Sequence, residues 1–255
     1  MSLFGKVLAS VGIGAATVDT KLEKSTYTAG EVMRGEIEVR GGKVAQQIDT
    51  IYLTVYTTFI READDTKYTA TAAVNKVKVS EPFTIEAGEN KVLPFSLSLP
   101  LETPITAGKT KVWVQTELDI KNAVDPEDKD YIDVKPSKLA ASVLDAVKGL
   151  GFRLRKAECE QASARFRGHY PFMQEFEFTP TGQYRSHLDE LEVIFLSQSE
   201  NSVELLLQID RKVKGLGSFF SEALDMDESF VRTTITTQDV PNLQAKLQQI
   251  ISKHL

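Results

Sequence analysis

The stretch "YTAGEVMRGEIEV" (residues 27–39) decides the fold class that this sequence predicts. Gly30 predicts a tight turn near its start, because glycine reaches positive φ without a Cβ clash. Ile37 and Val39 then alternate with glutamates, which is the period-2 pattern of a half-buried strand. Gly35 inside this pattern predicts a bulge or the close approach of another backbone. The stretch therefore indicates a turn followed by a strand in a β-protein.

Alternating apolar patterns continue along the whole chain. In the first half we expect strands in "ATVDTKLEKSTY", "QQIDTIYLTVYTTFIRE", "KVLPFSLSLP" and around 112–118. In the second half we expect them in "FRLRKAECEQA", around Phe176 and Phe178, in a hairpin joined at "SQSEN", and in "FVRTTITT". Turn signals recur about every 8–12 residues, which is typical of a β-sandwich.

Short helices interrupt this pattern. Residues 2–11, 137–151 and the C-terminal segment carry apolar residues at helical spacing, and 215–229 predicts a further short helix. Ser137 and Asp239 are the expected N-caps of the linker helix and the C-terminal helix.

The composition becomes acidic and turn-rich over 121–136, with two prolines, and we place a domain boundary there. We predict an all-β chain of two tandem β-sandwich domains, 1–128 and 129–255. Short N-terminal, linker and C-terminal helices accompany them.

The opening stretch resembles the early hairpin of the arrestin-like fold. The positions that carry this resemblance are Tyr27, Gly30, Glu31, Val32 and Gly35. "TIYLTVYTTF" and "LPFSLSLPLETPIT" lie where that fold has its next strands. Four longer blocks, at 9–23, 133–160, 171–195 and 215–235, are similar to the SpoOM-type sporulation-control proteins of bacteria.

The resemblance covers nearly the whole chain and has several implications. It implies two arrestin-like, immunoglobulin-like β-sandwiches in tandem. It also implies a cytoplasmic regulatory or scaffolding role and no known enzyme chemistry. That family is linked to control of the sporulation phosphorelay, but similar sequences occur in bacteria that do not sporulate.

Composition excludes several classes of protein. The chain has 30 basic and 36 acidic residues and a net charge of −6, and no segment is basic, so we expect no nucleic-acid partner. Cys159 is the single cysteine, which favours a reducing, cytoplasmic compartment. No apolar run reaches the roughly 18 residues of a membrane span. A secretory signal at the N-terminus stays an alternative, although Lys6 interrupts its apolar stretch.

No motif indicates catalysis. The three histidines lack metal-ligand spacing, and neither "GIGAAT" nor "KGLGS" has the context of a nucleotide-binding loop. The acidic clusters at 125–130 and 225–228 lack a complete calcium loop, although an unusual cation site at the first stays open. We therefore expect no enzyme activity, no catalytic residues, no cofactor and no metal.

The two terminal helices are the candidate partner-docking elements. Their apolar stripes either pack on their own domains or dock a protein partner or a second copy in a homodimer. The residues of these stripes are Leu3, Phe4, Val7, Leu8 and Val11, and Leu243, Leu247, Ile250 and Ile251. Strand addition at a sheet edge is a third mode of contact.

Besides a purely structural oligomer, two hypotheses for function remain. The first is a non-enzymatic adaptor or scaffold that binds protein partners of unknown identity. The second is a ligand-binding module or an unrecognised hydrolase, which requires a pocket of convergent titratable groups around His169, Arg165 or Glu175.

Overall fold

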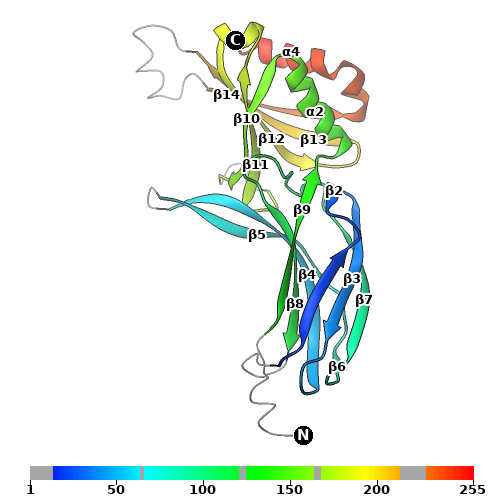
Figure 1. Ribbon diagram of the computed structural model, residues 1–255. Coiled ribbons are helices and arrows are strands. Elements are labelled where there is room, and N and C mark those ends of the chain that lie inside the picture. The colour runs from blue at the N-terminus through cyan, green and yellow to red at the C-terminus, as the bar shows by residue number, and fades with distance from the viewer. Residues whose placement is uncertain (1–13, 64–65, 121–124, 164–167, 213–227) are drawn as a thin grey trace. The chain divides into compact units, whose positions relative to one another are not determined.

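The computed structural model describes residues 14–63, 66–120, 125–163, 168–212 and 228–255 (Figure 1). The chain divides into two compact units. Unit 1 comprises Met1–Thr57, Thr71–Thr103 and Lys111–Lys135, and unit 2 comprises Thr58–Ala70, Pro104–Thr110 and Pro136–Leu255.

The division between the units differs from the expected boundary at 128/129. Strand β9 (Glu127–Lys135) runs through that position, because it pairs with β8 (Val112–Ile120) in its first part and with β2 (Thr26–Thr28) at its end. The division therefore falls after Lys135.

Unit 1 is built from two sheets. The first has the order β1-β3-β7, and all its pairs are antiparallel. Its strands are β1 (Thr17–Leu22), β3 (Val32–Arg40) and β7 (Asn90–Ser98). The second has the order β4-β8-β9-β2, and two further strands pair with β4. The strands not yet named are β4 (Gln46–Ala63), β5 (Thr66–Lys78) and β6 (Phe83–Ile85). The end of β4 and the start of β5 lie within Thr58–Ala70 and so belong to unit 2. Fully buried side chains from both sheets, such as Ile37 and Val114, form the core between them.

The opening stretch has the conformation that its glycines predict. Gly30 adopts a φ of +88° in the turn before β3. A Cβ on Gly35 would lie 2.3 Å from the carbonyl oxygen of Lys21 in β1 and 2.8 Å from a ring carbon of Phe95 in β7. The predicted close approach of another backbone at Gly35 is confirmed.

Unit 2 contains a five-stranded antiparallel sheet of order β14-β13-β12-β11-β10. Its elements are α2 (Lys138–Gly149), β10 (Phe152–Gln161), β11 (Phe172–Pro180), the 3-10 helix η1 (Gln183–Ser186), β12 (Leu188–Gln198), β13 (Ser202–Arg211), β14 (Glu228–Thr236), the 3-10 helix η2 (Thr237–Asn242) and α4 (Leu243–Ser252). Figure 1 shows α2 and α4 side by side along this sheet.

The layer packed against this sheet consists of helices, whereas a β-sandwich has a second sheet there. Val143 and Val147 of α2 and Leu247 of α4 share one buried cluster with Phe176 and Phe178 of β11. Within the described residues, helices therefore cover the face that a second sheet was expected to cover.

The helix caps are partly as expected. The side chain of Ser137 accepts a hydrogen bond from the backbone N–H of Ala140 at 3.3 Å, which confirms the predicted cap of α2. Asp239 instead lies in η2, where its carboxylate accepts from the N–H of Thr236 at 2.8 Å. The C-terminal α-helix begins at Leu243, behind Pro241, so the prediction that Asp239 caps it was wrong. The helices expected over 2–11 and 215–229 lie outside the described residues.

Candidate functional site

The predicted docking residues of the C-terminal helix are core residues. Leu243, Leu247 and Ile251 are at most 3% exposed, and Ile250 packs partly buried against the same cluster. Because this stripe faces the sheet of unit 2, it offers no docking surface, and that prediction is corrected. The predicted N-terminal docking residues, Leu3, Phe4, Val7, Leu8 and Val11, lie outside the described residues.

The acidic cluster at 125–130 stabilises the backbone. Asp125 accepts a hydrogen bond from the N–H of Ile120 at 2.8 Å, and Asp128 accepts one from the N–H of Thr20 at 2.7 Å. Burial and the neighbouring Asp128 raise the pKa of Asp130 to about 6. These carboxylates do not converge on a metal position. In the described parts of the chain, the residues close enough to share an ion are Glu177, Glu190 and Glu192.

Those three glutamates belong to a carboxylate network on the face of the unit 2 sheet opposite the helices. Arg155 donates to Glu177 at 2.7 Å and pairs with Glu190. Lys156 donates to Glu177 at 2.9 Å and also pairs with Glu158. The two cations of β10 thus neutralise part of the network.

The rest of the network is acidic and poorly solvated. Burial, followed by the charge of Glu160, raises the pKa of Glu175 to about 7. Burial, followed by the charge of Glu175, raises the pKa of Glu192 to about 8. Sequence reasoning missed this cluster, although alternate glutamates recur in "AECE", "QEFEF" and "DELEV". Cys159 on β10 is buried, as predicted.

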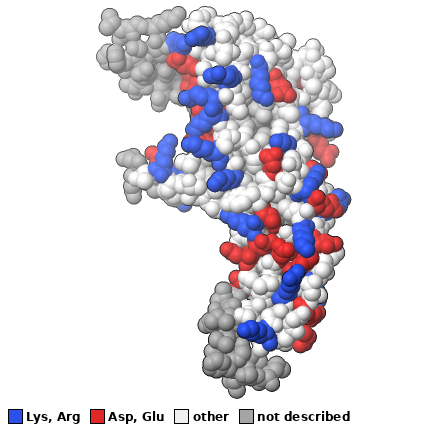
Figure 2. Space-filling view, in the orientation of Figure 1, with Lys and Arg blue, Asp and Glu red and all other residues white. Residues whose placement is uncertain are grey.

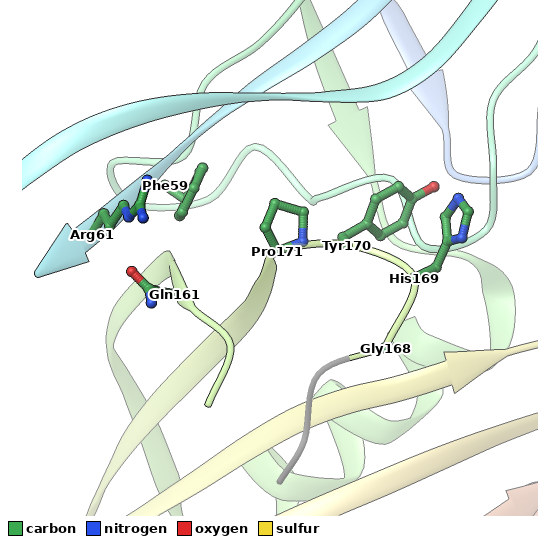
Figure 3. A pocket seen from close by; sticks show the side chains of 7 residues that line it. All are labelled: Phe59, Arg61, Gln161, Gly168, His169, Tyr170 and Pro171. Carbon is green, nitrogen blue, oxygen red and sulfur yellow. The ribbon is translucent and has the colours of Figure 1, made fainter. Parts of the chain in front are cut away.

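Figure 3 shows a pocket of about 380 Å³ in unit 2, where β4 and β10 pair in parallel at Ile60 and Glu160. Its lining residues are Phe59, Arg61, Gln161, Gly168, His169, Tyr170 and Pro171. The wall is aromatic: Tyr170 stacks on Phe172 with centroids 5.3 Å apart, and His169 meets Tyr170 edge-on at 4.9 Å.

The pocket brings together part of the set that the second hypothesis named. His169 lines it, Glu175 does not, and Arg165 lies outside the described residues. The described lining offers a guanidinium, an imidazole and an amide to a ligand. It contains no carboxylate or thiol among those residues.

A second concentration of polar and aromatic side chains lies on the face of the β4-β8-β9 sheet that points away from the core of unit 1. Strand pairing arranges these side chains in three rungs across the sheet, because paired residues of neighbouring strands point to the same side. The rungs are Tyr56–Trp113–Tyr131, Thr54–Gln115–Lys129 and Tyr52–Glu117–Glu127. We call these nine residues the acid–aromatic face.

The first rung is a row of aromatic rings. Trp113 stacks on Tyr56 with centroids 5.6 Å apart, and the ring of Tyr131 is tilted relative to Trp113 with centroids 6.0 Å apart. Trp113 is 4% exposed, whereas Tyr131 is 58% exposed. The Nζ of Lys129 lies 4.0 Å from the centroid of Trp113, so an ammonium covers the indole.

Hydrogen bonds fix the other rungs to this row. Gln115 accepts from the indole N–H of Trp113 at 3.3 Å and donates to Glu117 at 3.1 Å and Glu127 at 2.9 Å. Burial and the charges of these two glutamates raise the pKa of Tyr56. These hydrogen bonds therefore hold the side chains of Trp113, Gln115, Glu117 and Glu127 in fixed positions.

The acidic end of the face opens into a pocket of about 360 Å³. Its lining residues are Tyr52, Lys76, Glu117, Leu118, Asp119, Asp125, Pro126 and Glu127. The alternation in 112–119 already assigns Trp113, Glu117 and Asp119 to one side of a strand. Only the pairing with β4 and β9 brings the tyrosines and Glu127 beside them, so the sequence alone did not reveal the face.

Comparison with known proteins bears on the whole chain. The sequence model of the family described as "SpoOM protein" matches residues 4–213. The chain belongs to the SpoOM family.

A curated relative in the SpoOM family is the "Sporulation-control protein spo0M" of Bacillus subtilis (strain 168). It is 43% identical over 258 residues, which cover 100% of this chain and 99% of the relative. The crystal structure of Spo0M, sporulation control protein, from Bacillus subtilis superposes with a TM-score of 0.84 at 39% identity. That match covers 95% of this chain and 100% of the other. The resemblance inferred from the sequence and the mainly β fold are both confirmed. No helix of the described residues is long and apolar enough to cross a membrane.

Proposed function

We propose that this SpoOM-family protein is a cytoplasmic regulatory protein without enzymatic activity, and that it binds a protein partner through the acid–aromatic face. A sporulation-control relative that matches over the full length supports the regulatory role. The chain has a single cysteine, which is buried, and this supports the compartment. The observation that carries the binding role is the aromatic rung that ends in the exposed ring of Tyr131.

The face has the composition of a protein-binding surface. Tyrosine and tryptophan are enriched among the residues that dominate binding energy, and a polar rim usually surrounds them. Here the exposed ring of Tyr131, backed by the buried Trp113, forms the aromatic centre, and Glu117, Glu127 and Lys129 form the rim. A sheet holds all five, so little conformational freedom would be lost on binding.

Affinity capture from the native host tests this proposal. The bait is the full chain, compared with Tyr131→Ala and with Tyr68→Ala as a matched control, because Tyr68 is an exposed tyrosine of unit 2. We expect Tyr131→Ala to lose a specific protein that wild type and Tyr68→Ala retain. Equal recovery by all three baits would remove the face from the function.

A ligand-binding role is the second candidate, and the pocket of Figure 3 favours it. The guanidinium of Arg61 and the imidazole of His169 lie in the lining together with aromatic rings, which suits a small planar anion. A thermal-shift screen of anionic metabolites against wild type and Arg61→Ala tests it. A compound that stabilises only the wild type would support this role, and a compound that stabilises both proteins equally would argue against the pocket.

A further inference from the structure

We propose that the acid–aromatic face recognises a basic protein segment, with a partner arginine placed on Glu117 and Glu127. This inference rests on the proposed binding function and specifies the chemistry of the partner. Three features support it: the cations that already lie on the face, the carboxylates around them and the geometry of arginine.

The protein's own lysines show that the face attracts cations. The Nζ of Lys129 lies 4.0 Å from the ring centroid of Trp113 and 5.1 Å from that of Tyr131. The Nζ of Lys76 lies 4.2 Å from the centroid of Tyr52. Aromatic faces are negative and bind ammonium or guanidinium groups, more strongly as water is excluded. A partner's cation would meet the ring of Tyr131, which is 58% exposed, whereas Trp113 lies buried behind it.

The carboxylates exceed the cations at the acidic end. Four carboxylates (Glu117, Asp119, Asp125 and Glu127) line the pocket there, against the single ammonium of Lys76. Glu117 and Glu127 each accept one bond from Gln115, and Glu117 also pairs with Lys76 at 3.9 Å. An ionised carboxylate has room for further donors. A cationic partner would gain these acceptors, whereas a phosphorylated or nucleic-acid partner would meet like charge.

The wider electrostatics point to the same class of partner. Figure 2 shows a dense group of acidic side chains over the strands of unit 1 in the view that it presents. The chain carries a net charge of −6. Charge of this sign speeds the encounter with a basic segment, and the effect weakens as salt is added.

Arginine fits this site better than lysine does. Glu117 and Glu127 are paired across β8 and β9, so their carboxylates lie side by side and can share one planar, five-donor group. A guanidinium can bind carboxylates in a forked geometry while its plane stacks on an aromatic ring. An ammonium is a point charge and would bind with less geometric selectivity.

Titration of the full chain with capped synthetic peptides tests the inference. Trp113 is the only tryptophan, so its fluorescence reports on this face directly. The probes are a peptide of three arginines separated by glycines, its lysine counterpart, and its citrulline counterpart, which is isosteric and uncharged. We expect saturable binding of the arginine peptide, with an affinity about tenfold higher than for the citrulline peptide and a decrease as salt is added.

The double variant Glu117→Gln, Glu127→Gln should weaken binding of the arginine peptide about tenfold. Glu81→Gln, a glutamate of unit 1 with a side chain 83% exposed, is the control and should leave binding unchanged. Circular dichroism verifies that each variant is folded. Equal binding of arginine and citrulline peptides, full binding by the double variant, or no saturable change in wild type would overturn the inference.

The two proposals can fail separately. If Tyr131→Ala loses its partner in host capture but the arginine peptide does not bind, the face is used and the partner's chemistry is different. If the double variant weakens binding of the arginine peptide but Tyr131→Ala leaves host capture unchanged, the arginine site is supported and the proposed function is contradicted.

Discussion

Gly35 of β3 lies in close contact with both neighbouring strands of its sheet. Its Cα pairs with Leu22 of β1 and Phe95 of β7, and a Cβ would meet backbone on one side and a buried ring on the other. We expect Gly35→Ala to lower the free energy of unfolding by about 1–3 kcal/mol, the usual cost of overpacking. Urea unfolding measures this.

Gly168→Ala is the matched control for that prediction. An added Cβ there meets no heavy atom within 4 Å, and no positive φ is involved. Its free energy of unfolding should stay within about 0.5 kcal/mol of wild type. If the two variants were equally stable, the close approach at Gly35 would not exist in solution.

Glu192 gives the protein a pH-dependent stability. Its folded pKa of about 8 lies above its ordinary value of 4.5, so the folded state keeps a proton that the unfolded state loses. The free energy of unfolding should therefore fall as pH rises from 4.5 to 8 and level off above that. Glu175, with a pKa of about 7, acts in the same direction.

Glu192→Gln should remove part of this fall. The pKa of Glu192 is raised by the charges of three neighbouring glutamates, Glu175 and Glu177 of β11 and Glu190 of β12. On β13 the residue paired with Glu192 is the uncharged Gln208. The nearby positive charge comes from Arg155 and Lys156 of β10, which both pair with Glu177. After allowance for solvent screening, we expect a gain of about 1–2 kcal/mol relative to wild type at pH 8 and almost none at pH 4.5. An equal gain at both pH values would show that Glu192 ionises normally in the folded protein.

For single residues, the sequence predicted those features that depend only on residues nearby in the chain. Gly30 in a left-handed turn, Ser137 as a cap and Cys159 as a buried residue each follow from short-range chemistry. The raised pKa of Glu192 was not predictable, because its neighbours come from strands far apart in sequence.

The apolar stripe of helix α4 belongs to the core of unit 2. Leu247 is fully buried in the cluster between the helices and the sheet. We expect Leu247→Ala to cost about 2–5 kcal/mol of stability, because it leaves a cavity in that cluster. Thermal and urea unfolding measure the loss.

Val240→Ala, at a 40% exposed site just before α4, is the control and should be nearly neutral. A Leu247→Ala protein of unchanged stability that had lost a partner would restore this helix as a docking element. Periodicity predicted the helix and its apolar face, but not which surface that face meets. For the same reason the sequence did not predict which strands pair, and therefore did not predict the acid–aromatic face.

At the scale of the whole molecule, the role of the N-terminal residues remains a prediction from sequence. The apolar pattern of residues 2–11 predicts a helix that packs on its own domain or joins two copies. If it joins copies, Phe4→Asp should convert an oligomer to the 28.3 kDa monomer in light scattering after size exclusion. An oligomer that survives the substitution would place the interface elsewhere.

Much of the overall organisation was predictable, and its gaps have physical reasons. The alternation of apolar residues and the turn chemistry predicted the β class. The four family-like blocks predicted the relationship to SpoOM proteins. The helical layer of unit 2 was not foreseen, because α2 and α4 lie far apart in sequence and meet only after folding. Likewise β9 reads as a linker by composition, yet its pairing with β8 makes it part of unit 1.

The most direct test of the central claim is photo-crosslinking in the host cell from a benzophenone amino acid at position 131, with the same group at position 68 as the control. We expect a covalent adduct with a specific protein from position 131 and none from position 68. An adduct from position 68 alone would contradict the claim that the acid–aromatic face binds the partner.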